Sequence, residues 1–125
     1  MENNGHPTFG NGKICYIEIP AADINASAKF YETCFGWHIR TDNNGVASFD
    51  DAVTEVSGRW VTGRKAHTGD GLMISIMVFD ILATCNLVKD NGGAVIILPD
   101  MNAKDKVANI TDPYGNVWGL YQHGQ

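Results

Sequence analysis

Hydrophobic and polar residues alternate along several short runs, which predicts strands, and recur about once per turn along two longer runs, which predicts helices. The first series starts with a strand over 13–20 and a helix whose N-cap is Asp23. Gly36 ends that helix, because glycine takes the left-handed C′ conformation at little cost. β-like runs follow over 37–41, 46–50, 52–56 and 59–63, with a turn at Ser57-Gly58 before the last of them.

The same order of elements starts again after a loop over 64–71. It predicts a strand over 72–79, the N-cap Asp80, a helix over 81–91, a stop at Gly92-Gly93, and strands over 94–98, 106–111 and 116–122. A shift of 57 residues places Asp23 on Asp80, Gly36 on Gly93 and Gly58 on Gly115. Because helix caps, helix stops and final turns coincide, we predict an α+β chain of two tandem βαβββ modules.

Each module is expected to bury one face of a curved sheet under its helix and to leave the other face concave. Two such sheets together would form a curved, incomplete eight-stranded barrel around a cleft, where small ligands bind. We expect a flexible N-terminal arm over 1–12 and a single domain over 13–122, with modules at about 13–68 and 71–122.

Several runs of this sequence carry a family resemblance. They are 18–24 and 29–37 in the first module, and Asp80-Ile81, 91–94 and 111–120 in the second. Together they resemble the vicinal oxygen chelate superfamily, which includes glyoxalase I, bleomycin-resistance proteins and extradiol dioxygenases. The resemblance implies a domain over 13–122 and a small-molecule ligand. It does not imply one reaction, because members include isomerases, lyases, dioxygenases and metal-free proteins that sequester drugs.

The resemblance also implies metal ligands on the first and last strands of each module. Carried over by motif and by the 57-residue repeat, these positions are Tyr16, Thr62, Met73 and Gly119. None is His, Asp or Glu, the residues that bind a hard divalent ion. The histidines, which are His6, His38, His67 and His123, lie far apart in the sequence and do not fill these positions. We therefore predict no cofactor, with a divalent metal as the alternative.

Strand alternation indicates which side chains line the cleft. The candidate ligand-binding residues are Tyr16, Trp60, Thr62, Arg64, Met73, Ser75, Met77 and Tyr121. Glu18 is the candidate catalytic residue, since a carboxylate with a raised pKa on an inner strand face suits a general base. The structural alternative is that Glu18 hydrogen-bonds Tyr121 or pairs with Arg64.

The amino-acid composition of the chain limits the classes of partner and the cellular location that we expect. The net charge of −5, with Lys and Arg scattered, argues against nucleic-acid binding. The chain has no apolar run long enough to span a membrane, and the polar N-terminus lacks the features of a secretory signal, so we expect a cytoplasmic protein. Cys15, Cys34 and Cys85 form no pairing motif, and we expect reduced and mostly buried thiols.

These observations favour a glyoxalase-like protein that binds a small organic molecule without the usual metal. The resemblance to the superfamily also implies a homodimer. The alternative is an enzyme, either metal-dependent lyase, isomerase or dioxygenase chemistry, or metal-free acid–base chemistry at Glu18. A purely structural or partner-binding module is a third possibility, and it would have a filled cleft.

Overall fold

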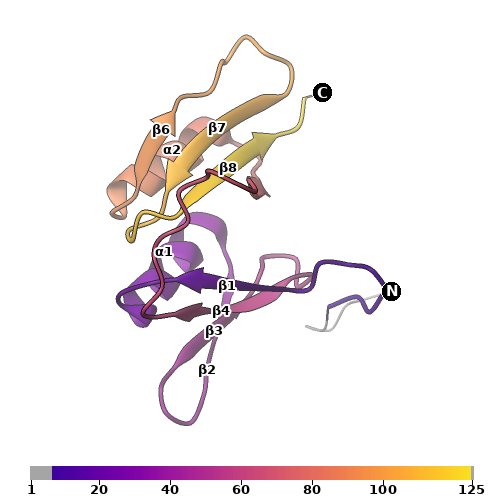
Figure 1. Cartoon of the computed structure of the whole chain (residues 1–125). Coiled ribbons are helices and arrows are strands. Elements are labelled where there is room, and N and C mark those ends of the chain that lie inside the picture. The colour runs from indigo at the N-terminus through magenta and orange to yellow at the C-terminus, as the bar shows by residue number, and fades with distance from the viewer. Residues whose placement is uncertain (1–6, 125) are drawn as a thin grey trace. The chain divides into compact units, whose positions relative to one another are not determined.

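The computed structural model describes residues 7–124, which form eight strands and two helices. The chain divides into two compact units, residues 1–64 and 65–125. Each unit runs strand, helix, then three strands, and Figure 1 shows one helix beside each sheet. The predicted α+β class and the tandem βαβββ modules are therefore confirmed. The predicted cleft between the modules stays a prediction.

Unit 1 is a four-stranded mixed sheet in the order β1-β4-β3-β2. Its first and last strands pair in parallel, and the other pairs are antiparallel. The elements are β1 (Tyr16–Pro20), α1 (Ile24–Phe35), β2 (His38–Thr41), β3 (Ala47–Asp50) and β4 (Ser57–Val61).

Unit 2 repeats this arrangement in the order β5-β8-β7-β6. Again the first and last strands are parallel and the others antiparallel. The elements are β5 (Ser75–Met77), α2 (Ile81–Asp90), β6 (Ala94–Ile97), β7 (Lys106–Thr111) and β8 (Val117–Gln122).

Both helices begin as the sequence predicts. The side chain of Asp23 accepts a hydrogen bond from the backbone N–H of Ala26, and that of Asp80 accepts one from Ala83, each at 3.0 Å. These bonds satisfy N–H groups that the first helical turn leaves unpaired. Gly36 ends α1 with a φ of 69°, as predicted, whereas Gly92 is the left-handed residue after α2.

Each helix packs on one face of its own sheet. Between α1 and its sheet lies an aromatic core, in which Trp37 stacks on both Tyr31 and Phe49 with ring centroids 4.7 and 4.5 Å apart. The core of unit 2 is mainly aliphatic, built from Ile81, Val88, Ile110 and Leu120, with Trp118 at its side. The face of each sheet opposite its helix is called the open face below.

The start of the last strand in unit 1 differs from the prediction. Residues 52–56 form a turn and not a strand, and Ser57 and Gly58 belong to β4 and not to a turn. The turn is organised by Asp51, whose Oδ1 accepts the backbone N–H groups of Glu55 at 2.7 Å and Val56 at 3.3 Å. The local pattern of Ala52–Val56 was therefore misleading, because a side chain before the run sets its conformation.

Gly58 serves packing and not a turn. A Cβ at this position would overlap the carbonyl oxygen of Ile17 and the ring of Phe49. Glycine inside a strand often marks such a close approach of neighbouring groups. Gly115, which the 57-residue shift aligned with Gly58, is instead a turn residue with a φ of 102°.

The repeat offset consequently changes along the chain. Ile19 pairs with Trp60 in unit 1, and Ile76 pairs with Leu120 in unit 2. The first strands are thus related by 57 residues (76 − 19) and the last strands by 60 (120 − 60). A slip of three residues is odd, so it moves every predicted side chain of β4 to the opposite face of the sheet.

Part of the predicted N-terminal arm, residues 1–6 with His6, lies outside the described residues. Within the described part, Thr8 donates a hydrogen bond from its hydroxyl to Glu55 at 2.8 Å. The ammonium of Lys13 donates to the carbonyl oxygen of Thr8, also at 2.8 Å. Neither helix within residues 7–124 has the length and apolar character needed to cross a bilayer.

Candidate functional site

The open face of unit 1 carries a row of polar residues that crosses all four strands. The strand register aligns Glu18 with Arg59, Arg59 with Ser48, and Ser48 with Arg40. Aligned residues on neighbouring strands point to the same face and lie close enough for long side chains to meet. Three of the four residues in this row are therefore charged.

Glu18 lies at one end of this row, between two arginines. Its Oε2 accepts a hydrogen bond from Nε of Arg59 at 2.9 Å and forms an ion pair with Nη2 of Arg59 at 2.7 Å. Its Oε1 accepts a hydrogen bond from Arg64 at 2.8 Å. The ion pair between Glu18 and Arg64 is one of the two structural alternatives expected from the sequence. The ion pair between Glu18 and Arg59 was not predicted.

These ion pairs determine the protonation of Glu18. The hydrogen bonds from Arg64, and next those from Arg59, hold the pKa of the Glu18 carboxyl below its ordinary value of 4.5, against a smaller opposing effect of burial. The expectation of a raised pKa is wrong, because the charged form has two cationic donors. A carboxylate with a lowered pKa is a poor general base, so this geometry favours the structural role of Glu18 over the catalytic one.

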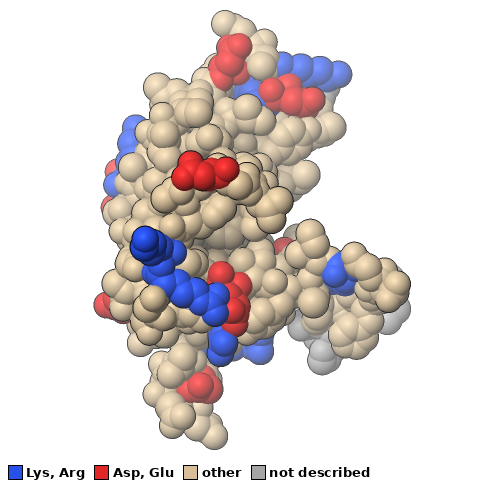
Figure 2. All heavy atoms as spheres, in the orientation of Figure 1, with Lys and Arg blue, Asp and Glu red and all other residues tan. Residues whose placement is uncertain are grey.

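A second ion pair lies beside the first on the same face. Arg40 donates to Oδ1 of Asp50 at 3.1 Å, and the hydroxyl of Ser57 donates to the same oxygen at 2.7 Å. His38 is aligned with Asp50 on the neighbouring strand. In the space-filling view, Lys and Arg side chains lie against Asp and Glu side chains at several places (Figure 2). The open face of unit 1 thus has paired charges of both signs.

Two predicted ligand-binding residues do not share this face. Trp60 is 2% exposed and packs in the core, with its ring centroid 5.0 Å from Phe49 and 5.8 Å from Tyr31. Thr62 lies beyond the end of β4 and lines a hollow of about 500 Å³ with residues near the start of α1, including Asp23 and Asn25. The cause is the three-residue slip, which places Arg59 and Val61, and not Trp60 and Thr62, beside Glu18.

The open face of unit 2 carries the equivalent row without a single charge. The register aligns Ser75 with Gly119, Gly119 with Asn109, and Asn109 with Ile97. The next row aligns Met77 with Tyr121 and Tyr121 with Val107. As predicted from strand alternation, Ser75, Met77 and Tyr121 share this face, and its two aligned rows mix polar and apolar residues without a charged one.

The metal-ligand positions implied by the family can now be placed by strand pairing. The first-unit equivalent of Gly119 is Arg59 and not Thr62, because Glu18–Arg59 corresponds to Ser75–Gly119. The four positions are therefore Tyr16, Arg59, Met73 and Gly119.

The residues at these positions do not suit a hard divalent ion. A guanidinium is a cation without a free electron pair, and methionine sulfur is a soft ligand. At Gly119 a Cβ would overlap the hydroxyl of Ser75, so no larger residue fits without a shift of that side chain. Both carboxylate oxygens of nearby Glu18 are bonded to arginines. Within residues 7–124, no three His, Cys, Asp or Glu side chains form a group that could hold a metal ion.

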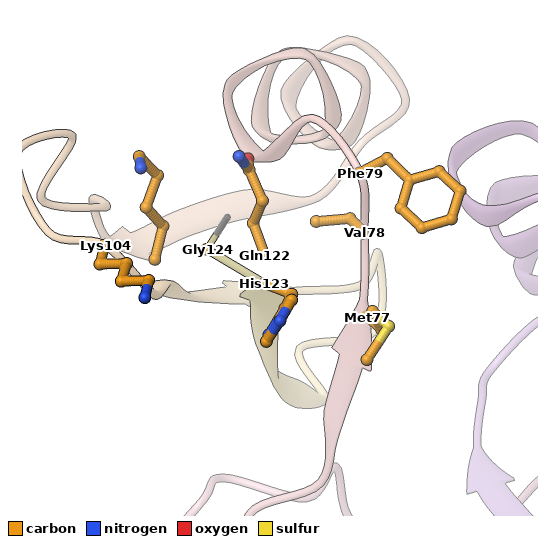
Figure 3. Close-up of a pocket in the computed structure, with 8 residues that line it drawn as sticks. Met77, Val78, Phe79, Lys104, Gln122, His123 and Gly124 are labelled. Atoms are coloured by element: carbon orange, nitrogen blue, oxygen red, sulfur yellow. The ribbon is translucent and has the colours of Figure 1, made fainter.

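A separate pocket of about 750 Å³ lies at the end of the unit 2 sheet (Figure 3). Its walls combine apolar and basic groups, and they are Met77, Val78, Phe79, Lys104, Lys106, Gln122, His123 and Gly124. Only Met77 among them was predicted as a ligand-binding residue. The basic residues were missed because they come from a loop and a strand end with no sequence pattern of their own.

Tyr121 lies next to this pocket. Its hydroxyl donates to Oδ1 of Asp105 at 3.1 Å and lies 3.0 Å from Nδ1 of His123. Burial, and then the hydrogen bond to Asp105, raise the pKa of the Tyr121 hydroxyl. At neutral pH Tyr121 is therefore a protonated phenol that orients the residues at the end of β8. The alternative in which Glu18 hydrogen-bonds Tyr121 joins residues of the two units and stays a prediction.

Comparison with known proteins identifies the family. Residues 13–120 match the model of the Glyoxalase/Bleomycin resistance protein/Dioxygenase superfamily. A "Probable lactoylglutathione lyase" of Vibrio parahaemolyticus is 30% identical over 132 aligned positions, covering 94% of this chain and 95% of that protein. A "Glyoxylase-like domain-containing protein" of Didymella fabae is 34% identical over 90 residues, covering 66% of this chain and 70% of that protein.

Solved structures agree with this assignment at the level of the fold. The fosfomycin resistance protein FosX of Mesorhizobium loti superposes with a TM-score of 0.70 at 12% identity, covering 91% of this chain and 93% of that one. TnmS3, an antibiotic binding protein of a Streptomyces species, superposes with a TM-score of 0.67 at 21% identity, covering 94% and 100%. The family model and the Vibrio parahaemolyticus relative show that the chain belongs to the glyoxalase/bleomycin-resistance/dioxygenase superfamily, and the two βαβββ units agree with this.

Proposed function

We propose that this protein binds a small, partly apolar organic molecule on the open faces of its sheets, without a metal at the family's ligand positions. The observation that carries the proposal is Arg59. It occupies a position where a metal-dependent relative needs an electron-pair donor, and its guanidinium is bonded to Glu18. A fixed cation at that point repels a divalent ion, and the ion pair also occupies the nearest carboxylate.

The lining of unit 2 supports an organic ligand. Met73 and Met77 are 41% and 64% exposed, and Val107 on the same face as Met77 is 60% exposed. Methionine side chains adapt to ligands of varied shape because they are unbranched and polarizable. The pocket of about 750 Å³ next to Met77 also falls within the range of small-molecule sites. TnmS3 is named as an antibiotic binding protein, and its similarity to this chain extends to the fold alone.

The test is to measure metal content and stability on the same purified sample. We expect native mass spectrometry to show no stoichiometric metal ion, and we expect a chelator to leave Tm unchanged. A stoichiometric Zn, Ni, Mn or Fe ion whose removal lowers Tm would overturn the metal-free proposal. An organic molecule that co-purifies with the native protein would identify the ligand directly.

A metal-dependent lyase or isomerase is the second candidate, and one observation favours it. The Vibrio parahaemolyticus relative named a probable lactoylglutathione lyase matches over nearly the whole length of both chains. The test is lactoylglutathione turnover with and without added Zn²⁺ or Ni²⁺. We expect no metal-stimulated turnover, because Tyr16, Arg59, Met73 and Gly119 supply no suitable ligand set. Turnover that depends on the metal would establish the second candidate.

Metal-free acid–base catalysis at Glu18 is a third candidate, with weaker support because the pKa of Glu18 is lowered. Once a substrate is identified, Glu18→Gln decides the matter. A variant that keeps full turnover eliminates Glu18 as the base, and a loss of turnover without loss of binding would restore it.

We further propose that the protein forms a homodimer in a cytoplasmic setting. Exposed apolar side chains such as Leu72 and Phe79, at 81% and 95% exposure, suit an interface with a second copy. Light scattering of the purified protein tests the dimer. The described cysteines are free thiols, and burial raises the pKa of Cys34 to about 11, which makes this thiol a poor nucleophile.

A further inference from the structure

We propose that Arg59 and Arg64 form a binding site for a ligand carboxylate, and that Glu18 is a built-in competitor that occupies this site when no ligand is bound. The inference rests on the proposed small-molecule binding and adds the chemical class of the ligand, which is an organic anion and specifically a carboxylate.

The first support is the geometry of the two arginines. They approach one carboxylate from two sides, with Arg59 on Oε2 of Glu18 and Arg64 on Oε1. A guanidinium has five N–H donors in a fixed fork that matches a carboxylate. Arg59 donates its Nε–H to Glu18 and places Nη2 in an ion pair with the same oxygen, and it has no hydrogen bond to another described residue. The pair therefore already binds one carboxylate, and Arg59 retains donor capacity for another.

The second support is the balance of charge. Two guanidiniums contact the single carboxylate of Glu18, on a chain whose net charge is −5. Both arginine side chains are more than half exposed, whereas Glu18 is 31% exposed. An incoming anion thus reaches the cations more easily than a cation reaches Glu18. Arg40, by contrast, is neutralised by a single partner, Asp50.

The third support is the surroundings of Arg59 on the open face. Ser48 is aligned with it on the neighbouring strand and supplies a hydroxyl donor. Tyr16 lies two residues before Glu18 on the same face of β1 and is 51% exposed. An aromatic ring beside a pair of guanidiniums suits a ligand with both an aromatic body and a carboxylate.

A competing location for an anion is the pocket in unit 2, which is lined in part by Lys104, Lys106 and His123; Figure 3 labels Lys104 and His123. Lysine is a point charge without the planar fork of arginine, and Lys106 donates to the carbonyl oxygen of Ala103 at 2.8 Å. The arginine pair is therefore the better match for a planar carboxylate, and the experiment separates the two locations.

The experiment titrates the full-length protein with benzoate and with benzamide, which have the same ring but differ in charge. NMR signals of the arginine Nε–H groups and of the methionine methyls report where each probe binds. We expect benzoate to bind about tenfold more tightly than benzamide and to shift the Arg59 and Arg64 signals. Arg59→Gln and Arg64→Gln should each remove most of this preference, while Arg40→Gln, a matched control on the same face, should keep it.

The variant Glu18→Gln distinguishes a Glu18 that competes with the ligand from a Glu18 that has only a structural role. Removing the internal competitor should tighten benzoate binding by about fivefold and leave benzamide binding unchanged. A loss of benzoate binding in this folded variant would overturn the proposal. Backbone amide spectra of each variant establish that it remains folded.

The remaining outcomes are also decisive. Equal binding of benzoate and benzamide, with shifts at Met73 and Met77, would overturn the carboxylate site and leave small-molecule binding intact. Benzoate binding that is lost in Lys104→Gln and kept in Arg59→Gln would place the anion in the unit 2 pocket and overturn the proposal. If neither probe shifts any open-face signal, the carboxylate site and its parent proposal both fail.

Discussion

The two units of this protein share one backbone plan, but their open faces have opposite chemistry. The row Glu18–Arg59–Ser48–Arg40 in unit 1 occupies the same register as the row Ser75–Gly119–Asn109–Ile97 in unit 2. The charged residues of the first row form ion pairs within the row and with Asp50 and Arg64, and the second row has no charged residue. The helix-covered faces are both apolar, because each must exclude water to hold its helix. Burial restricts the residue types on the helix-covered face of each unit, whereas the residue types on the open face can differ between the units.

The largest expected effect comes from Gly58, the strand glycine under the ring of Phe49. Its counterpart in unit 2, by the 60-residue offset of the last strands, is Trp118, so the two cores fill this space differently. Gly58→Ala should lower the free energy of unfolding by about 3 kcal/mol, because the new Cβ overlaps Ile17 and Phe49. Urea unfolding measures the loss. The control is Gly71→Ala, where a Cβ meets no atom within 4 Å and the change should be small.

A smaller effect should separate the two aspartates that organise the final hairpin turns. Asp112 is 1% exposed and accepts hydrogen bonds from three backbone N–H groups and from the Asn116 side chain. Asp51 accepts two, in a more exposed turn. Asp112→Ala should therefore cost about 2 kcal/mol and Asp51→Ala about 1 kcal/mol. Equal losses in thermal or urea unfolding would mean that burial does not distinguish the two turns.

The smallest effect is the pH dependence that Glu18 gives to unit 1. Its pKa is lowered in the folded state, so its ion pairs stabilise the fold above the unfolded-state value near 4.5. That stabilisation is lost as the pH falls through the folded-state pKa. The Tm of the wild type should exceed that of Glu18→Gln at pH 7, and the difference should shrink toward pH 3. Ser75→Ala, at the equivalent position of unit 2, should show no such pH dependence, and a difference that grows on acidification would contradict the assignment.

The sequence predicted the elements whose causes are local. Asp23 and Asp80 cap their helices through residues three positions away, so the signal lies within a single turn. The order of strands and helices followed from hydrophobic periodicity, and the family followed from its motifs. These features needed no knowledge of which strands lie side by side.

The register of β4 could not be predicted in this way. Gly58 looks like a turn glycine unless the ring of Phe49, nine residues earlier, is known to cover it. Because Gly58 was read as a turn residue, the predicted register of β4 differed by three residues from the observed one. Arg59 was therefore missed, Trp60 was predicted on the open face, and Thr62 was predicted as a metal-ligand position. The ion pairs of Glu18 join residues 41 and 46 positions apart, and only the fold brings them together. Candidate sites on sheets therefore depend on register more than on residue type.

Ser75 and Gly119 have a consequence for any attempt to place a carboxylate metal ligand at position 119. Because the Ser75 hydroxyl occupies the volume that a side chain at position 119 needs, adding a glutamate there alone would introduce a collision before it added a ligand. The productive change is a concerted one, with Ser75 made smaller in the same step and Arg59 exchanged for a neutral donor. We therefore expect single substitutions at these positions to bind no metal ion, and only variants that combine them to do so.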